Sequence, residues 1–333
     1  MAKNKKVILR ADGGPNIGMG HFVRTLALGE MLQDDFYCIY ATRVPTNQQK
    51  QEIKNVCHEL IELPADDSHF NDFLKYLQGD EIVVLDNYYF HTEYQKKIKN
   101  IGSKLVCIDD MHDKHYVTDV VINHAEGIND EAFSIEKYTK LYKGFKYALL
   151  RKPFLRETES QKRCFDILIS MGGSDPYDIS NELVSKINNT YSDLQIGIIL
   201  GSAYNGGLKQ KTLSKNIRLF TNQSAQNIIK LMKRSYFGIF PASTIAIEAI
   251  AARLPFAIGY FTNNQKEIYL GIINNKLGFP LGFLKELDIS MVNQLLIKIR
   301  NSEKKDFQDI KEKQYEKLDK QSPQRINKIF NNL

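Results

Sequence analysis

The sequence predicts an α/β protein of two domains, each a doubly wound parallel sheet, and two observations carry this prediction. Short apolar runs rich in Val and Ile alternate with amphipathic segments over residues 5–150 and again over 164–285. Such runs are typical of parallel strands that helices cover on both faces. Each stretch also has a glycine-rich turn directly after its first strand, where a ligand would meet the carboxyl ends of the strands. We therefore expect the two domains to face a central cleft.

Residues 1–150 are expected to form the first domain. Its strands are predicted at residues 6–10, 36–42, 82–86, 105–109 and 120–123, and its helices at 21–33, 48–56, 70–77 and 92–100. Residues 144–153 look like a last strand that stops at a proline, and residues 151–163 are polar enough to be the linker between the domains.

The second domain is expected over residues 164–285. Its strands are predicted at residues 166–171, 194–200, 217–220, 236–241 and 256–260, and its helices at 177–188, 225–233 and 245–252. Residues 286–333 alternate in charge and carry spaced apolar positions, which is typical of helices packed on a surface.

The first glycine-rich turn, residues 12–20, leads directly into the predicted helix that starts at His21. Backbone N–H groups of the turn and the positive end of the helix dipole favour an anionic ligand. An imidazole at this place could transfer a proton to or from whatever carries the anion. The alternative is a simple tight turn followed by a partly exposed histidine.

Polar side chains follow the ends of the predicted strands of the first domain. Because parallel strands end at the same edge, we expect these groups to gather near His21; they are Asp12, Asp86, Asn87, Tyr88, Asp109, Asp110, Asn123 and His124. A solvated loop rim would contain similar residues. His112 and His115 stand three residues apart but have no obvious third ligand, so we expect no metal site.

The second glycine-rich turn, Gly172 and Gly173, follows the first strand of the second domain. Ser174 or Asp175 is expected to cap the next helix, with Pro176 at its first position. The two glycines add a concave set of backbone N–H groups that suits a diphosphate.

A later segment of the second domain, Ser243 to Ala252, contains one carboxylate in an otherwise apolar helix. Ser243 or Thr244 could cap this helix, and Glu248 is expected either to reach a ribose diol or to mark the solvent side of the helix. Asn264 and Gln265, after the next predicted strand, could contact a sugar or a diphosphate and are equally common in turns.

The overall composition of the 333 residues is that of a globular protein, with a net charge of +6. No apolar run approaches the length of a membrane span, no signal peptide is evident, and a cytoplasmic location is expected. The four cysteines lack metal-binding or paired spacing and are expected to be reduced thiols; they are Cys38, Cys57, Cys107 and Cys164.

Together these motifs resemble the nucleotide-sugar hydrolases of pseudaminic acid synthesis, which are related to the peptidoglycan GlcNAc transferase. The likeness covers residues 5 to about 280 and rests on the two glycine turns, the aspartates at the strand ends and the segment around Glu248. It implies a GT-B fold with two Rossmann-like domains, and hydrolysis of a UDP-linked 2,4-diacetamido-2,4,6-trideoxy sugar with inversion at C1.

The resemblance also implies roles for individual residues. His21 would be the catalytic residue, with Asp86 or Tyr88 assisting the water, and Glu248 would bind the ribose. The uracil would lie against the backbone of residues 217–221. The remaining substrate-binding candidates are Gly18, Gly20, Arg24, Asn123, Gly172, Gly173, Ser174, Ser243, Thr244, Asn264 and Gln265.

The same resemblance implies no cofactor and no metal, and we expect a monomer without a nucleic-acid partner. Residues 13–16 replace a more serine-rich turn of the family and the chain after residue 280 is longer, so the exact sugar stays open. The alternatives are a GT-B glycosyltransferase that passes the sugar to an acceptor, and a nucleotide-sugar-binding regulator without turnover.

Overall fold

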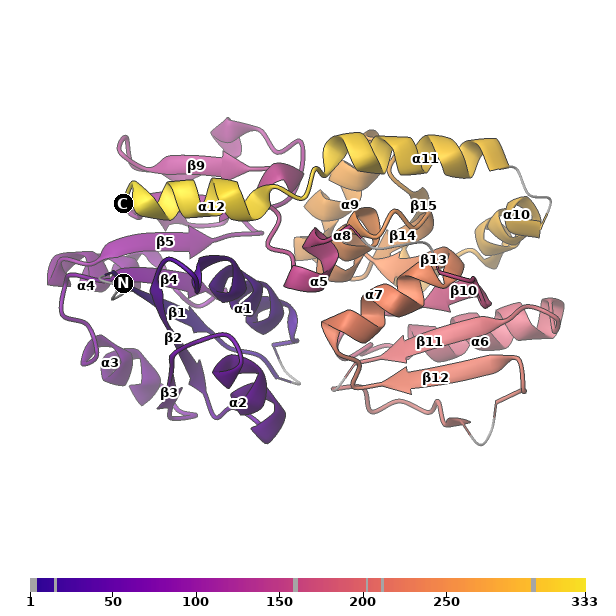
Figure 1. Cartoon of the computed structure of the whole chain (residues 1–333), viewed down its shortest axis with the longest axis horizontal. Helices are drawn as coiled ribbons and strands as arrows, with labels where there is room; N and C mark the ends of the chain where they lie inside the picture. The colour runs from indigo at the N-terminus through magenta and orange to yellow at the C-terminus, as the bar shows by residue number, and fades with distance from the viewer. Residues whose placement is uncertain (1–4, 15–16, 158–160, 202, 211–212, 301–303) are drawn as a thin grey trace. The chain divides into compact units, whose positions relative to one another are not determined.

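The computed structural model describes residues 5–14, 17–157, 161–201, 203–210, 213–300 and 304–333 (Figure 1). The chain divides into two compact units. The first contains residues 1–152 together with the last stretch, 321–333, and the second contains residues 153–320. Each unit is described below by itself.

Unit 1 contains a seven-stranded sheet in which every neighbouring pair is parallel. In spatial order its strands are β3 (Glu59–Leu63), β2 (Tyr37–Arg43), β1 (Lys6–Ala11), β4 (Ile82–Asp86), β5 (Lys104–Ile108), β7 (Val120–Asn123) and β9 (Lys140–Lys143). The order steps from β1 to β4 in the middle of the sheet, and ligands of doubly wound folds bind at such a switch in strand order.

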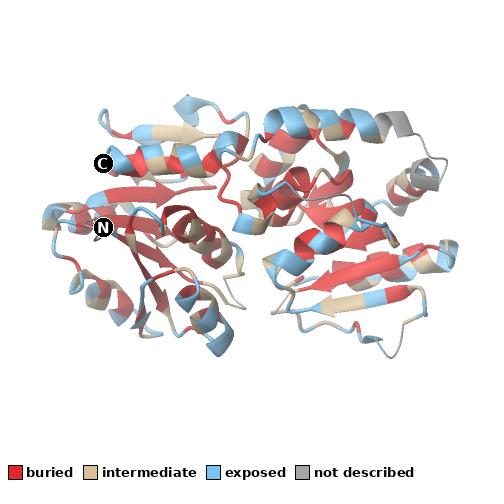
Figure 2. Cartoon of the chain, viewed as in Figure 1, coloured by how far each residue is buried: buried red, intermediate tan, exposed pale blue. Residues whose placement is uncertain are grey.

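The helices of unit 1 are α1 (Gly20–Leu32), α2 (Asn47–Lys54), α3 (Ser68–Leu74), α4 (Thr92–Ile101) and α12 (Ser322–Asn331). Short elements complete it: β6 (His115–Tyr116), β8 (Ser134–Ile135), and the 3₁₀ turns η1 (Asp130–Ala132) and η2 (Phe145–Tyr147). The central strands are buried along nearly their whole length, as Figure 2 shows in red, because helices cover both of their faces.

The last helix, α12, packs against α1 and η2 of unit 1 (Figure 1). Its Phe330 is fully buried and meets the ring of Phe36 at 6.1 Å between centroids. Asn327 donates to the backbone carbonyl of Met31 at 2.8 Å. The C-terminal end of the chain therefore completes the core beside the sheet that its N-terminal end begins.

Unit 2 contains a six-stranded parallel sheet. In spatial order its strands are β12 (Ile217–Thr221), β11 (Ile196–Leu200), β10 (Phe165–Ile169), β13 (Ser235–Pro241), β14 (Phe256–Tyr260) and β15 (Phe279–Phe283). Its helices are α6 (Ile179–Thr190), α7 (Ala225–Lys233), α8 (Thr244–Ala251), α9 (Lys266–Asn274), α10 (Ile289–Arg300) and α11 (Lys304–Lys317), with the 3₁₀ turns η4 (Asn263–Gln265) and η5 (Leu284–Glu286). The short helix α5 (Lys152–Leu155) lies where the two units meet in sequence.

The structure corrects two of the expected elements. Residues 144–153 form no strand: Gly144 has a φ of 95°, η2 follows it, and α5 then contains the proline. The helix expected at residue 177 begins at Ile179, and Asp178 rather than Ser174 or Asp175 stands at its N-cap.

Three strands that the periodicity did not predict lie at or near the edges of the sheets. They are β3, β9 and β15, and β15 even contains Pro280. An edge strand needs hydrogen bonds on one side only, so it tolerates a proline and exposed charges that a central strand would not. The glutamates of β3 and the lysines of β9 interrupt the apolar pattern, and the proline of β15 argues against a strand.

No helix within the described part of the chain is both long enough and apolar enough to cross a membrane.

Candidate active site

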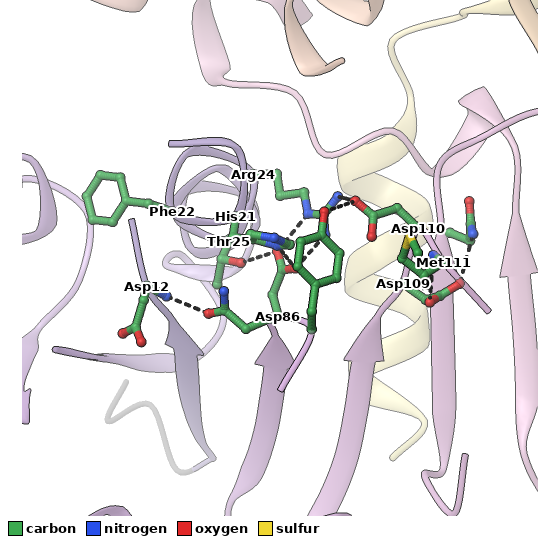
Figure 3. A network of polar contacts seen from close by, with 12 residues as sticks. Asp12, His21, Phe22, Arg24, Thr25, Asp86, Asp109, Asp110 and Met111 are labelled. Carbon is green, nitrogen blue, oxygen red and sulfur yellow. Dashed lines mark hydrogen bonds and ion pairs between the residues drawn. The ribbon is translucent and has the colours of Figure 1, made fainter. Parts of the chain in front are cut away.

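The candidate active site of unit 1 lies where β1, β4, β5 and β7 end beside the start of α1 (Figure 3). These four strands are consecutive neighbours in the sheet, so the polar residues after them are brought to one edge. α1 contributes His21, Arg24 and Thr25, which stand at positions i, i+3 and i+4 and thus share one face of the helix.

His21 and Asp86 form a buried pair at the centre of this edge. The imidazole Nδ1 lies 2.7 Å from Asp86 Oδ1, and the two side chains are 5% and 0% exposed. A carboxylate beside Nδ1 favours the tautomer in which Nδ1–H donates, which leaves a lone pair on Nε2. Both polar contacts of the imidazole with the described residues are made by Nδ1, with Asp86 and, at 3.0 Å, with Arg24 Nη2, and Nε2 has no hydrogen-bond partner among those residues. The imidazole is therefore arranged as a proton acceptor.

Two further residues of α1 hold Asp86 in place. Arg24 donates to both carboxylate oxygens, from Nε at 2.7 Å and from Nη2 at 2.5 Å, and Thr25 Oγ1 donates to Oδ2 at 2.7 Å. Burial alone would raise the pKa of Asp86, but the charge of Arg24, the nearby His21 and their hydrogen bonds hold that pKa well below its ordinary value. Asp86 is thus a fixed negative charge.

Asp110 and Tyr88 extend this network away from the sheet. Arg24 Nη1 donates to Asp110 Oδ2 at 3.0 Å, and the hydroxyl of Tyr88 donates to the same oxygen at 3.3 Å. The Tyr88 ring meets the imidazole of His21 edge-on, with 4.6 Å between centroids. Burial and the charge of Asp110 raise the pKa of Tyr88, so the phenol stays protonated and acts as a donor.

The network beside the imidazole holds three buried charges. Two carboxylates, Asp86 and Asp110, pair with one guanidinium, Arg24. All three side chains are at least nine-tenths buried, so solvent screens these ion pairs weakly.

Asn123 and Asp109 have structural partners at the ends of β7 and β5. Asn123 is fully buried, donates through Nδ2 to Asp109 at 3.1 Å and accepts from the backbone of Ala125 at 2.8 Å. Asp109 also accepts from the hydroxyl of Tyr116 and from the backbone of His112. The amide of Asn123 is thus engaged within the protein.

The glycine-rich turn in front of α1 is closed by a short backbone bridge. Gly18 donates to the carbonyl of Gly14 at 2.7 Å, Gly14 donates back at 3.1 Å, and Gly18 has a φ of 82°. Gly20 is the first residue of α1, and a Cβ on Gly18 or Gly20 would meet only open space. Residues 15 and 16 of the turn lie outside the described part of the chain.

In unit 2 the other predicted residues also follow neighbouring strands. Gly172, Gly173 and Ser174 come after β10, Ser243 and Thr244 come after β13, and Asn264 and Gln265 come after β14. These three strands are adjacent in the sheet, in the order β10, β13, β14. Gly172 has a φ of 83° and open space where a Cβ would stand, so its backbone is accessible.

Asp175 stabilises the loop after Gly173 without being the N-cap. Its two carboxylate oxygens accept from the backbone N–H groups of Ile179 and Ser180, each at 2.9 Å. The sequence did indicate a capping role for this carboxylate, but the helix begins two residues later than expected.

The start of α8 presents Ser243 and Thr244. Ser243 is its N-cap residue, and its side chain makes no capping hydrogen bond. Glu248 lies just over one turn further on and is 1% exposed, so it does not mark a solvent side of the helix. Gln265 accepts from the backbone of Phe261 at 2.9 Å, and Asn264 accepts from the hydroxyl of Thr262 at 2.6 Å.

Two residues of the unit 1 site escaped the sequence reasoning. Thr25 shares the helix face of His21, and that spacing could have identified it. Lys114 lines a pocket beside His21 from a loop and donates to the carbonyl of Tyr88 at 3.0 Å, and no local pattern points to that contact. Asn87, which was expected near His21, lines the same pocket.

No group of three or more His, Cys, Asp or Glu side chains among the described residues is arranged to hold a metal ion. The two histidines three residues apart have other neighbours: His115 lies 2.8 Å from the hydroxyl of Ser134 and 3.1 Å from Glu136, and His112 packs on Phe133.

Comparison with solved structures identifies the class of fold. The crystal structure of MurG from Acinetobacter baumannii matches with a TM-score of 0.63 at 12% identity, over 99% of this chain and 100% of that one. Two parallel Rossmann-like sheets with this match make the fold GT-B, as expected from the motifs. No model of a known protein family matches the chain.

Comparison with known sequences identifies individual relatives. The chain is 29% identical over 271 residues to UDP-2,4-diacetamido-2,4,6-trideoxy-β-L-altropyranose hydrolase of Campylobacter jejuni, which covers 78% of this chain and 93% of that protein. The resemblance that the motifs indicated is thereby confirmed. The chain is also 26% identical over 282 residues to the uncharacterized protein MJ1062 of Methanocaldococcus jannaschii, but it spans only 57% of the length of that protein.

Proposed function

We propose that the protein hydrolyses a UDP-linked 2,4-diacetamido-2,4,6-trideoxy sugar to UDP and the free sugar, with inversion at C1, as a step of pseudaminic acid synthesis. The observation that carries the proposal is the buried His21–Asp86 pair at the end of the sheet, with Nε2 left as a proton acceptor. The similarity to the Campylobacter hydrolase supports the choice of sugar and of hydrolysis.

In this mechanism His21 is the general base. Nε2 takes a proton from water while the water oxygen bonds to the anomeric carbon, and the bond from that carbon to the β-phosphate oxygen breaks. UDP leaves with the electron pair of the broken bond. Asp86 is a positioning residue: it holds Nδ1–H and balances the charge that forms on the imidazole.

The nucleotide is assigned to unit 2. We propose that backbone N–H groups of Gly172 and Gly173 and the start of α8 at Ser243 and Thr244 bind the diphosphate, and that Glu248 binds the ribose. UDP can leave as an anion, without being protonated by an acid, when hydrogen bonds stabilise the charge of its diphosphate. We therefore expect turnover without a metal ion.

A glycosyltransferase is the second candidate, because the solved structures that match the whole chain include that of CalG4, the calicheamicin glycosyltransferase. It would bind the same donor and release UDP only in the presence of an acceptor. The two candidates differ in whether UDP appears when water alone is offered.

The test measures UDP release from UDP-2,4-diacetamido-2,4,6-trideoxy-β-L-altrose by the purified protein with EDTA and without acceptor, with the anomeric proton followed by NMR. We expect rapid release and an inverted free sugar. Absence of release together with tight UDP binding would favour the transferase instead.

Two variants separate the proposed roles. His21→Ala should lower kcat by about 100-fold or more, since a general base contributes that much, and leave the Kd for UDP near the wild-type value. Glu248→Ala should do the converse, weakening UDP binding in calorimetry. Equal losses of both properties in both variants would contradict the assignment.

A further inference from the structure

A second buried carboxylate lies on the same edge of the unit 1 sheet as His21. Asp12 follows β1 (Figure 3), and its backbone N–H donates at 2.9 Å to Asn87, which lines the pocket beside His21. Its carboxylate accepts from Arg10 Nη1 at 2.5 Å and from the hydroxyl of Tyr89. Burial alone would raise the pKa of Asp12, but the charge of Arg10 and these hydrogen bonds hold that pKa well below its ordinary value. Asp12 therefore stays ionised and can orient a neighbouring cation.

Arg43, the last residue of β2, is such a cation. Its backbone N–H donates to Asp12 Oδ1 at 2.8 Å, and its side-chain Nε donates to Oδ2 at 2.5 Å. Its guanidinium lies over the ring of Tyr89, 5.0 Å from the centroid. A carboxylate at one end and a ring against one face together fix the plane of the guanidinium.

The two terminal nitrogens of Arg43 remain available to a ligand. Nη1 and Nη2 have no hydrogen-bond partner among the described residues, and the side chain is 22% exposed. The buried side-chain atoms without a partner in the described part of the chain do not include either of them, so both are accessible. Arg43 thus presents N–H donors side by side in a fixed plane.

The backbone directly after Arg43 has an unusual conformation. Val44 has a φ of 38°, which a β-branched residue rarely adopts, and it is 65% exposed. Its N–H donates to the carbonyl of Leu63 in β3 at 3.2 Å. Residues in such conformations gather at ligand-binding sites, where the surrounding contacts hold them in place. At this exposure Val44 contributes little to the core, and its conformation instead favours a segment shaped around a ligand.

We propose that Arg43 binds the 4-acetamido group of the sugar, with Nη1 and Nη2 donating to the carbonyl oxygen of that group, and thereby makes the protein specific for a 4-acylated sugar. The inference rests on the proposed hydrolysis, in which His21 acts at the anomeric carbon. Hydrogen bonds from a charged donor are stronger than those between neutral groups, and paired N–H groups in one plane restrict the direction from which the acceptor approaches.

The spacing of the strands favours the 4-acetamido group over the 2-acetamido group. β2, β1 and β4 are consecutive in the sheet, and adjacent strands lie about 4.8 Å apart, so the ends of β2 and β4 are about 10 Å apart. β4 ends at Asp86, which holds His21. C2 of the sugar is bonded to the anomeric carbon, whereas C4 lies across the pyranose ring from it. The group on C4 is therefore the one that extends from His21 toward Arg43.

The first experiment removes the terminal nitrogens alone. In Arg43→Gln the amide nitrogen takes the place of Nε, so a donor to Asp12 is kept while Nη1 and Nη2 are lost. Calorimetry in the His21→Ala background, which does not consume the sugar nucleotide, compares three ligands: the UDP-linked 2,4-diacetamido sugar, its analogue with a hydroxyl group at C4, and UDP. We expect Arg43→Gln to raise the Kd of the diacetamido compound about 10-fold or more, and to leave the other two within about twofold. Equal losses for the diacetamido compound and the hydroxyl analogue would assign Arg43 a merely structural role and overturn the proposal.

Arg163→Gln is the matched control. Arg163 likewise lies over a tyrosine ring, 4.6 Å from the centroid of Tyr236, but it precedes β10 and so stands at the amino end of a strand. This variant should leave all three dissociation constants unchanged. Melting temperatures show whether each variant is folded.

The second experiment needs no substitution of Arg43. With Arg43 intact, the His21→Ala protein should bind the diacetamido compound at least about 10-fold more tightly than the hydroxyl analogue. Equal affinities would overturn the proposal. If this preference is found but the wild-type protein releases no UDP from the diacetamido compound, the proposed hydrolysis fails while the role of Arg43 stands, so the two failures are distinguishable.

Discussion

His21 and Asp86 form a pair whose geometry depends on a third residue, Arg24. The guanidinium joins Asp86 to Asp110, so removing the Asp86 charge affects both the imidazole and the arginine. Buried charges that lose a partner are strongly destabilising, whereas exposed pairs contribute little.

Asp86→Asn tests this dependence. We expect it to lower the free energy of unfolding by about 3 kcal/mol and to lower kcat at least about 100-fold, since Arg24 loses its main partner and His21 its orienting carboxylate. Asp72→Asn is the control, because Asp72 pairs with Lys75 at the surface. It should change stability by less than about 1 kcal/mol. Equal effects of the two variants, measured by urea unfolding, would refute the role of the buried network.

A second histidine links stability to pH. His124 is 2% exposed; burial, reinforced by the charge of Arg24, lowers its pKa from 6.5 to about 4, although Asp110 and Asp86 oppose this shift. His21 also faces it. Between pH 6.5 and 4 the unfolded chain therefore binds more protons at this residue than the folded protein does.

The free energy of unfolding should accordingly fall as pH falls through that range, by up to roughly 3 kcal/mol for this one group. His124→Gln should show a shallower dependence on pH. Unfolding measured at pH 7.5, 6 and 5 checks the prediction, and identical slopes for the variant and the wild type would show that other groups are responsible.

Local sequence patterns predicted some residues of the site and not others, and the difference has a physical cause. The strand ends pointed to Asp86, Tyr88 and Asp110 because parallel strands end together, and the structure brings these side chains to His21. Lys114 reaches the site from a loop, and the orientation of the Asn87 amide depends on a tertiary hydrogen bond from the backbone of Asp12. Neither leaves a periodic signal in the chain.

At the scale of elements, buried central strands were predictable and edge strands were not. β4, β7 and β14 have the expected bounds, because continuous apolar runs are distinctive. β3 contains the exposed Glu59 and Glu62 among its apolar residues, and β15 has Pro280 at its second position, where a central strand rarely has a proline. The helix α6 began later than expected because Asp175 caps it from a distance.

The last helix offers a test at the same scale. Phe330→Ala should lower the free energy of unfolding by about 3–5 kcal/mol, since the ring is fully buried against Phe36 in unit 1. Asn331→Ala, at an exposed position of the same helix, should change it by no more than about 0.5 kcal/mol. A small effect of Phe330→Ala in urea unfolding would show that α12 is not part of that core.

At the scale of the molecule, the two units share one architecture, a parallel sheet covered by helices, and have different roles in the proposed mechanism. Unit 1 carries the buried proton acceptor, and unit 2 carries glycine and helix-start features suited to a diphosphate. The two parallel sheets were predictable from hydrophobic alternation, but the joining of the last helix to unit 1 was not, because only long-range contacts encode it.

The measurement that tests the central claim most directly is hydrolysis in ¹⁸O-labelled water, with the released UDP analysed by mass spectrometry. Attack of water on the anomeric carbon breaks the bond between that carbon and the phosphate oxygen. The account therefore predicts UDP without label and label in the freshly formed sugar. Label in the terminal phosphate of UDP would show attack at phosphorus and contradict the proposed role of His21.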